Sequence, residues 1–339
     1  MTDRSAQIDH FLQVNDLAHV ARSDLAGDAS NRRYFRLTHS DGPPLVLMDA
    51  PPSKGEDTRP FVRIAKYLKD VGLSAPNIVA QDDANGFLIL EDLGDDLFAR
   101  LVDSHPEMEV ELYTSATDLL VDLHRHRPPA DLATYDASDA AELAALSIDW
   151  YAFGVSETKD DQSRDQLAAE MARLIKAHAP QCDVLVQRDF HSENLLWLAN
   201  RTSHRRVGLL DFQDALAGHR SYDLVSLLQD ARRDVSPEIE MQMVDHYIAS
   251  TGQIADQFKT AYAVWGAQRN LRIIGVFARL CMRDGKPGYI PYIPRVWNLL
   301  RRDLVHPGLE HLNRLVLDAL PEPSPGSLST LEAKCARTP

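Results

Sequence analysis

Short runs of alternating polar and apolar residues fill the first part of the chain and predict a small antiparallel sheet. The runs RRYFRLTH and PLVLMDA, between about residues 20 and 50, are separated by glycine, aspartate and proline residues that favour hairpin turns. A helix is expected next, because Pro60 suits a first turn and apolar residues from Phe61 to Leu68 recur on one face before Gly72. The following run, GFLILEDLG, is typical of a buried strand that ends in an acidic connector.

The apolar positions beyond this connector follow a helical period. Positions 112, 116, 119, 120 and 123 are all leucine or alanine at helical spacing, and a long helix is expected from about residue 255 to 282. Two strand-like runs, DVLVQRDF and RVGLLDFQDA, interrupt the helical part. The Pro/Ser-rich stretch PEPSPGSLST predicts a disordered C-terminus. We therefore expect an α+β fold with a β-rich N-lobe at residues 1–92, a larger, mainly helical C-lobe at 93–320 and a disordered tail at 321–339.

Composition and charge narrow the class of protein. The 339 residues are 44% hydrophobic and 25% charged, which is typical of a soluble globular chain. No run approaches a membrane span and MTDRSAQIDHF lacks a signal-like apolar region, so a cytoplasmic location with no membrane partner is expected. The net charge of -14 disfavours nucleic acid as a partner. The widely spaced Cys182, Cys281 and Cys335 indicate neither a disulfide framework nor a zinc site.

Three oxygen-bearing side chains on two predicted loops form the clearest chemical pattern. In QRDFHSENLLWL, Asp189 stands five residues before Asn194, and in LLDFQDA an apolar strand ends at Asp211. Each residue alone would be typical of a turn or a helix cap. Phosphoryl transfer, however, uses one carboxylate to orient the acceptor hydroxyl and accept its proton, and further oxygen ligands to hold magnesium against the phosphates. The pattern therefore predicts a kinase that uses ATP and magnesium, with Asp189 as base and the other two as metal ligands.

These loops resemble the aminoglycoside phosphotransferase family of kinase-like enzymes more closely than protein kinases. RDFHSEN is similar to that family's catalytic loop, and LLDFQDALAGHRSYDL to its metal segment, where the resemblance implies that Asp223 stabilises the loop. The segments DASNRRYFRL, MDAPPSKGEDTRPF, LEDLGDDLF and QRNLRIIGVFARL are similar to bacterial anomeric kinases of N-acetylmuramate and N-acetylglucosamine in cell-wall recycling. The resemblance spans most of residues 27–303. It implies a bilobal protein-kinase-like fold, an amino-sugar substrate and a product that feeds UDP-sugar formation.

The nucleotide side departs from the usual kinase pattern. The lysine expected on the third strand is absent, since Met48 stands at the equivalent place, and the following helix offers no buried glutamate. Another cation is expected to serve the phosphates, in the order Arg33, Lys54, Arg32. The turn GDASNRRYF has a single glycine, so Ser30 and backbone amides are expected to cradle the phosphates, although an ordinary hairpin turn is an equal alternative. The resemblance also implies that adenine meets the connector near two residues: Glu91 and Leu93.

The acceptor side offers a helical stripe of cationic and amide side chains. Gln268, Arg272 and Arg279 fall on one face of the long predicted helix, at i, i+4 and i+11. Such guanidinium groups suit the lactyl carboxylate of N-acetylmuramate, although a solvated arginine face remains the alternative. Three further side chains beside the catalytic and metal loops are candidates either for sugar hydroxyls or for hydrogen bonds within the loops: His191, Glu193 and Asp214.

Two other functions remain open on the sequence alone. An aminoglycoside or other amino-alcohol phosphotransferase would use the same mechanism, and the acidic surface would suit its cationic substrates. An inactive nucleotide-binding regulator would explain the missing lysine and glutamate, but it has no need of the base Asp189. The expected partners are small molecules, a monomer is the expected state, and the preference between ATP and GTP is left open.

Overall fold

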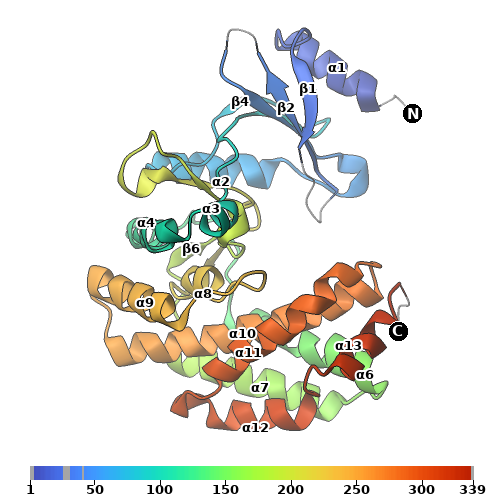
Figure 1. Ribbon diagram of the computed structural model, residues 1–339, viewed down its shortest axis with the longest axis vertical. Helices are drawn as coiled ribbons and strands as arrows, with labels where there is room; N and C mark the ends of the chain where they lie inside the picture. Colours follow the sequence, from blue (N-terminus) through green and yellow to red (C-terminus); the bar gives the residue numbers. More distant parts are fainter. Residues whose placement is uncertain (1–3, 26–30, 40–41, 337–339) are drawn as a thin grey trace. The chain divides into compact units, whose positions relative to one another are not determined.

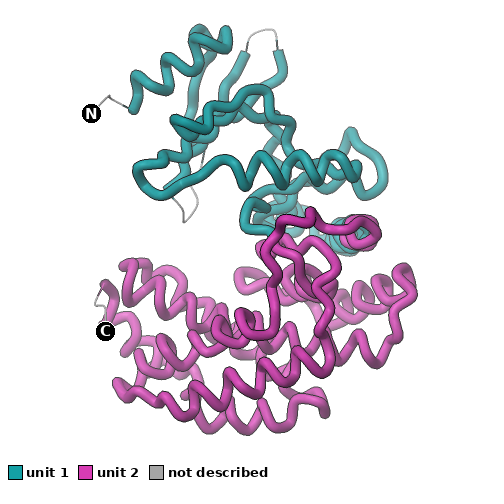
Figure 2. Tube along the Cα trace, turned by 180° about the vertical axis from the view of Figure 1, so that it is seen from behind, with its two compact units in different colours: residues 1–119, 192–215 teal, residues 120–191, 216–339 magenta. Residues whose placement is uncertain are grey.

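The computed structural model describes residues 4–25, 31–39 and 42–336, and the chain divides into two compact units. Unit 1 comprises residues 1–119 and 192–215, and unit 2 comprises residues 120–191 and 216–339 (Figure 2). The expected division at residues 92 and 93 therefore differs from these units, because the hairpin that follows the catalytic loop packs with the N-terminal part of the chain. Unit 1 is rich in strands and unit 2 is mainly helical, as the fold class predicted.

A five-stranded antiparallel sheet forms the upper part of unit 1 (Figure 1). Its strands are β1 (Ala21–Leu25), β2 (Arg33–Thr38), β3 (Leu45–Asp49), β4 (Ile78–Asp82) and β5 (Phe87–Glu91), in the order β1-β2-β3-β5-β4. The register places Tyr34 opposite Met48, and Met48 opposite Leu88. The predicted hairpin sheet is thus confirmed. Burial alternates along β2 and β4, whereas the central strands β3 and β5 bury consecutive apolar residues.

An N-terminal helix, α1 (Arg4–Val14), covers one face of this sheet. Ile8, Phe11 and Leu12 stand at helical spacing and are buried in one cluster with Leu37 of β2 and Leu47 of β3. The sequence analysis did not predict α1. The expected helix after the third strand is α2 (Arg59–Asp70), which has a proline in its first turn and buries its apolar stripe.

The rest of unit 1 consists of two helices, a short hairpin and single 3-10 turns. Their bounds are α3 (Phe98–Ser104), α4 (Glu109–Leu123, which runs into unit 2), β7 (Leu195–Trp197), β8 (Val207–Leu209) and 3-10 turns at Pro52–Lys54, Pro106–Met108, Ser192–Asn194 and Ser203–Arg206. The β7–β8 hairpin pairs Leu195 with Leu209 in antiparallel register. It follows directly on the catalytic loop in the sequence, so it carries the metal-ligand candidates.

Unit 2 is a helical assembly with one short strand pair. The strands are β6 (Val184–Val186) and β9 (Leu216–Gly218), and the helices are α5 (Ala137–Leu146), α6 (Phe153–Ser156), α7 (Asp161–His178), α8 (Tyr222–Leu228), α9 (Pro237–Thr251), α10 (Ala255–Met282), α11 (Ile293–Asp303), α12 (Glu310–Ala319) and α13 (Pro325–Glu332), with a π-helix at Ser147–Ala152 and 3-10 turns at Pro287–Tyr292 and Pro307–Leu309. The long helix predicted near residues 255–282 is α10. It packs on α5, α7 and α11 and is the central element of the unit.

Close approach of backbones explains one glycine of α10. A Cβ at Gly275 would lie 2.3 Å from the carbonyl carbon of Leu146, at the end of α5. Since real side chains do not approach so closely, only glycine lets α10 pack against the backbone there. Gly275 lies on the arginine stripe that the sequence analysis singled out. That stripe therefore turns toward α5 in the region of Gly275.

The C-terminal segment is ordered where disorder was expected. Residues 325–332 form α13, and the hydroxyl of Ser324 caps the helix by accepting a hydrogen bond from the N–H of Ser327 at 3.2 Å. Leu331 is fully buried. The expectation for residues 321–339 was therefore wrong for this helix, because a serine cap, a proline in the first turn and one buried leucine suffice when α10 and α6 supply a surface. Within the described residues, no helix is long and apolar enough to cross a membrane.

Candidate active site

The loop that carries Asp189 is held in unit 2 by a buried carboxylate. Asp223, near the start of α8, accepts hydrogen bonds from the backbone N–H of Gln187 at 2.6 Å and of Arg188 at 2.9 Å. The hydroxyl of Ser226, one turn later, donates to the carbonyl of Arg188 at 3.2 Å. Arg188 itself has a φ of 74°, in the left-handed region that non-glycine residues rarely occupy. These bonds fix the backbone on the N-terminal side of Asp189.

Burial dominates the electrostatics of this support. Asp223 is fully buried, and this burial raises the pKa of its carboxyl group to about 7, against the opposing effect of the two backbone hydrogen bonds. Asp189 is only half-buried and lies close enough to Arg269 and Arg272 to affect both guanidinium groups. Burial acts to lower the pKa of Arg272, but Tyr222, Asp189 and their neighbours raise it overall. Asp189 thus has two guanidinium groups, those of Arg269 and Arg272, in its surroundings.

His191 is neutral and braces the catalytic loop. Burial lowers the pKa of its imidazole to about 4, although the nearby Asp230 and Asp189 oppose this shift. Because the Arg232 guanidinium can only donate, its Nη1 donates to Nε2 of His191 at 3.3 Å. A neutral imidazole that accepts from an arginine is not a second base at neutral pH. The geometry therefore favours the role of a loop hydrogen-bonder over a contact with sugar hydroxyls.

A pocket of about 410 Å³ lies within unit 2, between the residues that follow α8 and those of α11. Its lining includes Asp230, which stands two residues before Arg232, the residue that contacts His191. The pocket is also lined by four further polar side chains: Arg233, Arg295, Asn298 and Arg302. Arg295 is held by two hydrogen bonds to Asp234, at 2.7 and 3.0 Å, and Arg302 is paired with Glu240. The pocket combines fixed cations with the apolar Leu228, Val235 and Leu299. Its volume falls in the range of small-molecule sites.

The stripe on α10 turns inward. Gln268 is fully buried, and its amide donates to the hydroxyl of Tyr135 at 3.0 Å and to the carbonyl of Ala140 at 2.8 Å. Arg272 donates to the hydroxyl of Tyr222 at 2.8 Å, and Arg279 is half-buried. Gln268 therefore supports the aromatic groups below the catalytic loop, and its donors are not available to a substrate. The stripe is not a solvated arginine face.

The two metal-ligand candidates lie on neighbouring backbone segments in unit 1. Asn194 ends a 3-10 turn, and its carbonyl accepts from the N–H of Leu210 at 3.0 Å, one residue before Asp211. This bond places Asn194 beside the residue that precedes Asp211. An amide and a carboxylate with room for phosphate and water oxygens match the way magnesium is bound in kinases. The described residues contain no group of three or more histidine, cysteine or acidic side chains that could hold a metal ion.

Asp211 is fixed from two sides. It has a φ of 54°, and its Oδ1 accepts from Gln213 at 2.8 Å and from Arg32 at 3.2 Å. The next residue, Phe212, stacks on Phe61 of α2 with ring centroids 4.8 Å apart. The aromatic pair ties the metal segment to the helix beneath the sheet. Asp214 and Glu193 are both exposed in unit 1 and stay candidates for contacts with substrate.

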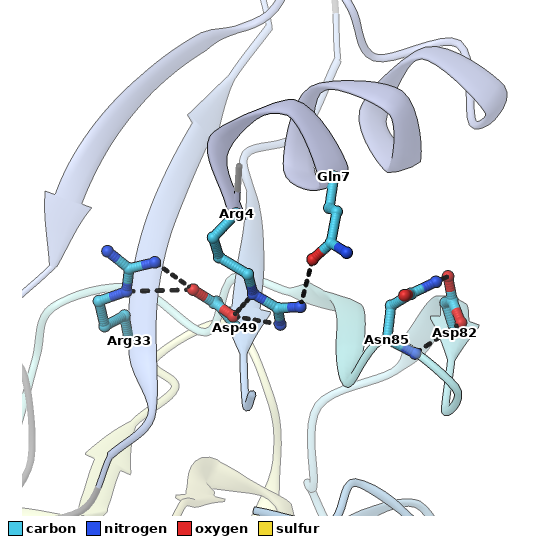
Figure 3. Close-up of polar contacts among 6 residues, drawn as sticks. All are labelled: Arg4, Gln7, Arg33, Asp49, Asp82 and Asn85. Carbon is cyan, nitrogen blue, oxygen red and sulfur yellow. Dashed lines mark hydrogen bonds and ion pairs between the residues drawn. The ribbon is translucent and has the colours of Figure 1, made fainter. Parts of the chain in front are cut away.

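The three cations near the turn GDASNRRYF, which was expected to cradle the phosphates, have different partners in the structure. Arg33 donates to Asp49 through Nε at 3.0 Å, and Arg4 holds the other oxygen of the same carboxylate (Figure 3). Arg32 instead reaches Asp211 and Glu56, and only 11% of its side chain is exposed, against 56% for Arg33. Lys54 is exposed in the 3-10 turn after β3. Arg32 is thus less exposed than Arg33 and is the one that reaches Asp211, and Ser30 lies outside the described residues.

Strand β3 and helix α2 lack the lysine–glutamate ion pair of kinases, as the sequence predicted. Met48 on β3 is 1% exposed, and α2 contains no glutamate, so neither half of the kinase lysine–glutamate pair is present in the described sheet and helix. Glu91 at the end of β5 accepts from Arg201 at 2.6 Å, and its own N–H donates to Asn77 at 2.8 Å. This N–H is therefore not available to adenine. Leu93, two residues later, is half-buried in the connector.

Sequence reasoning missed several residues that this geometry brings in. Arg188, Arg232, Arg233 and Arg269 surround the catalytic loop or line the pocket, but arginines in QRDF and ARRD have no spacing that separates them from solvated charges. The position of Arg188 directly before Asp189 was the one sequence signal that could have marked Arg188 as a candidate.

The family model and the relatives that match this chain agree with one another, since all are named as phosphotransferases or kinases. A family model described as "Phosphotransferase enzyme family" matches residues 22–258. The chain is 36% identical to an N-acetylmuramate/N-acetylglucosamine kinase of Caulobacter vibrioides over 92% of this chain and 95% of that protein. It is 35% identical to the protein of the same name from Pseudomonas aeruginosa over 88% of each chain.

Solved structures share the fold at low sequence identity. The choline kinase LicA from Streptococcus pneumoniae matches with a TM-score of 0.59 and 12% identity, over 91% of this chain and 99% of that one. An ADP-bound aminoglycoside phosphotransferase, APH(2'')-Ib, matches with a TM-score of 0.58 and 15% identity, over 86% and 96%. Both resemblances confirm the predicted kinase-like fold.

Proposed function

Because this chain belongs to the phosphotransferase enzyme family, we propose that it transfers the γ-phosphoryl group of ATP to the anomeric hydroxyl of N-acetylmuramate and N-acetylglucosamine. The proposal rests on two relatives of that name, each matched over most of its length. The products would be sugar 1-phosphates, which are the form from which UDP-sugars are made. We propose a cytoplasmic enzyme that acts as a monomer on small molecules.

The observation that carries the catalytic part of the proposal is the support of Asp189. A fully buried carboxylate, Asp223, holds two consecutive N–H groups directly before it. A loop fixed in this way presents the Asp189 side chain with little freedom, as a catalytic base requires. Asp189 orients the acceptor hydroxyl and takes its proton as the bond to phosphorus forms.

Asn194 and Asp211 would hold magnesium. An amide oxygen and a carboxylate are hard ligands, and in kinases the remaining positions are taken by phosphate and water oxygens. When bound, the ion supplies neutralisation of the charge on the phosphates. Arg32 then takes the place of the missing lysine, since it reaches Asp211 and has a guanidinium suited to a phosphate.

We further propose that the sugar occupies the pocket beside Asp230. Its walls offer apolar surface for a sugar face and cations for a carboxylate, and the neighbouring Arg232 contacts His191 on the catalytic loop. Arg233 is the proposed ligand of the lactyl carboxylate, because it lines this pocket and its guanidinium group can hold a carboxylate through two hydrogen bonds. Arg272, the candidate from the sequence, donates to Tyr222 and is assigned to the support of the loop.

A comparison of two arginine variants tests this assignment. Arg233→Ala should raise the KM for N-acetylmuramate by about tenfold or more and change that for N-acetylglucosamine by less than about twofold, because only the first sugar carries the carboxylate. Arg272→Ala, the matched control, should affect both sugars alike. If Arg272→Ala raises the KM for N-acetylmuramate alone and Arg233→Ala affects both sugars alike, then Arg272 is the ligand of the carboxylate.

Phosphorus NMR of the product tests the function itself. The purified chain is incubated with magnesium-ATP and, separately, with N-acetylmuramate, N-acetylglucosamine and an aminoglycoside. A new anomeric phosphate from the two N-acetyl sugars supports the proposal. Phosphate on the aminoglycoside alone would establish the amino-alcohol alternative, and no product from any acceptor would favour an inactive nucleotide-binding regulator.

A further inference from the structure

Two of the three cysteines meet at the C-terminal end of α10. Cys281 lies in the last turn of that helix and is fully buried, and Cys335 follows α13 and is half-buried. Both are free thiols, and they lie close enough that Cys335 adds to the effect of burial in raising the pKa of Cys281. They are 54 residues apart in the chain, so only the packing of the C-terminal segment brings them together.

The backbone fixes this meeting independently of the thiols. The N–H of Ala336 donates to the carbonyl of Cys281 at 3.0 Å, and the thiol of Cys281 contacts the carbonyl of Leu331 at 3.6 Å. With standard backbone dimensions, the first bond holds the Cα atoms of Cys281 and Cys335 within about 8 Å of each other. Disulfides span about 4.4 to 6.8 Å between Cα atoms, so a small local adjustment suffices.

Other contacts anchor the same segment. Lys334, next to Cys335, donates to the carbonyl of Gly154 at 2.5 Å and pairs with Glu157 at 3.0 Å. The side chain of Leu331 is buried, and α13 contacts both α6 and α10. The C-terminal segment therefore stays at the end of α10 when both cysteines are reduced. A bond between the thiols would link two parts that are already docked.

We propose that Cys281 and Cys335 are a redox modification site that forms a reversible disulfide when the chain meets hydrogen peroxide. The half-buried Cys335 reacts first: its S–H becomes S–OH and the peroxide is reduced to water. The sulfur of Cys281 then attacks the Cys335 sulfur, so that the S–O bond breaks, the S–S bond forms, and the hydroxyl leaves with the Cys281 proton as a second water. A dithiol reductant reverses the bond by thiol–disulfide exchange.

The order of these steps follows from the environment of each thiol. Burial and the contact with Cys335 raise the pKa of Cys281 to about 12, so this thiol is a poor first target for an oxidant. Cys335 is the more exposed of the two. Cys182 stands apart, with its thiol donating to the carbonyl of Tyr135 at 3.5 Å near β6. It serves as the internal control.

Thiol counting on the full chain tests the proposal. The chain is treated with dilute hydrogen peroxide, quenched and unfolded, and its thiols are counted with Ellman's reagent. The reduced protein should show three thiols and the oxidised protein one, with three again after dithiothreitol. Digestion without reductant should yield a single cross-linked peptide pair that contains Cys281 and Cys335. Three thiols after peroxide, or a bond that involves Cys182, would overturn the proposal.

Two variants sharpen the result. Cys182→Ser should still lose both of its remaining thiols, whereas Cys335→Ser should keep both. Oxidation of the chain in concentrated urea is the control for the folded geometry, and it should give a mixture of pairings. If the native chain gives the same mixture, or if Cys335→Ser still loses two thiols, the docked pair is not the site.

Discussion

Two fully buried aspartates, one in each unit, are satisfied by different kinds of donor. Asp223 in unit 2 accepts from two backbone N–H groups of the catalytic loop. Asp49 in unit 1 lies between the guanidinium groups of Arg4 and Arg33, whose side chains are 24% and 56% exposed. Backbone donors cannot turn to water when their partner is lost, but long arginine side chains can.

This difference shows where each unit tolerates change. The loop around Asp189 depends on buried bonds with no substitute, so its geometry is strictly determined. In unit 1, the two arginines that hold Asp49 are partly exposed, so water can hydrate them if the carboxylate is lost. We propose that Arg32, which reaches Asp211, serves the phosphates in place of the lysine of other kinases.

The largest effect is expected from the catalytic base. Asp189→Asn should lower kcat by about 10³-fold, since general base catalysis contributes about 10² to 10⁴. The affinity for ATP should stay within a few-fold, because Asn194, Asp211 and Arg32 are unchanged. Steady-state kinetics and nucleotide titration measure the two quantities. Turnover close to that of the unmodified chain would remove Asp189 from the role of base.

The two buried aspartates can be compared directly by truncation. Asp223→Ala leaves two buried N–H groups without an acceptor and should lower the free energy of unfolding by about 2–5 kcal/mol. Asp49→Ala should cost about 1–2 kcal/mol, because Arg4 and Arg33 can be hydrated. Urea unfolding of both variants measures the difference. Equal losses would show that the kind of donor does not matter here.

Two neighbouring arginines, Arg32 before β2 and Arg33 at its start, separate phosphate binding from structural support. Arg32→Ala should raise the KM for ATP by about tenfold, as expected for the loss of a charge-assisted hydrogen bond. Arg33→Ala, the matched control, should leave that KM within about twofold and act on stability alone. If Arg33→Ala has the larger effect on ATP, the order expected from the sequence is restored.

The titration of Asp223 should make the stability of the chain depend on pH. Its pKa is raised from 3.8 to about 7 in the folded chain by burial, so the folded state binds more protons than the unfolded state between these values. The free energy of unfolding should therefore fall as pH rises from about 4 to 7, by at most about 1.4 kcal/mol per pH unit from this group. Asp223→Asn has no carboxyl group to titrate, so its free energy of unfolding should lack this pH-dependent contribution. The difference between the two proteins, measured by urea unfolding at several pH values, should show the slope, and a parallel pH dependence would contradict it.

The sequence predicted the parts of the site that depend on local pattern. Asp189, Asn194 and Asp211 were predicted from spacing and strand ends, and α2 and α10 from their apolar period. The choice between Arg32 and Arg33 could not be made in this way. Arg32 precedes β2 and Arg33 begins it, so the contact of Arg32 with Asp211 depends on tertiary structure that the local pattern does not reveal.

The other features that the sequence analysis did not predict depend on tertiary structure. Helix α1 and helix α13 are short, and each is stabilised by a few apolar residues that are buried against another element. Gln268 belongs to a stripe that would suit an exposed helix face as well as a buried one. Only the position of α10 against α5 turns that stripe inward.

Phosphorylation of a blocked sugar tests the central claim most directly. Initial rates of ATP consumption are compared for N-acetylglucosamine and for its methyl glycoside, in which the anomeric hydroxyl is replaced by a methoxy group. Our account predicts turnover of the free sugar and none of the glycoside, which should at most compete for the pocket. Phosphorylation of the glycoside at a comparable rate would place the phosphate on another hydroxyl and contradict the account.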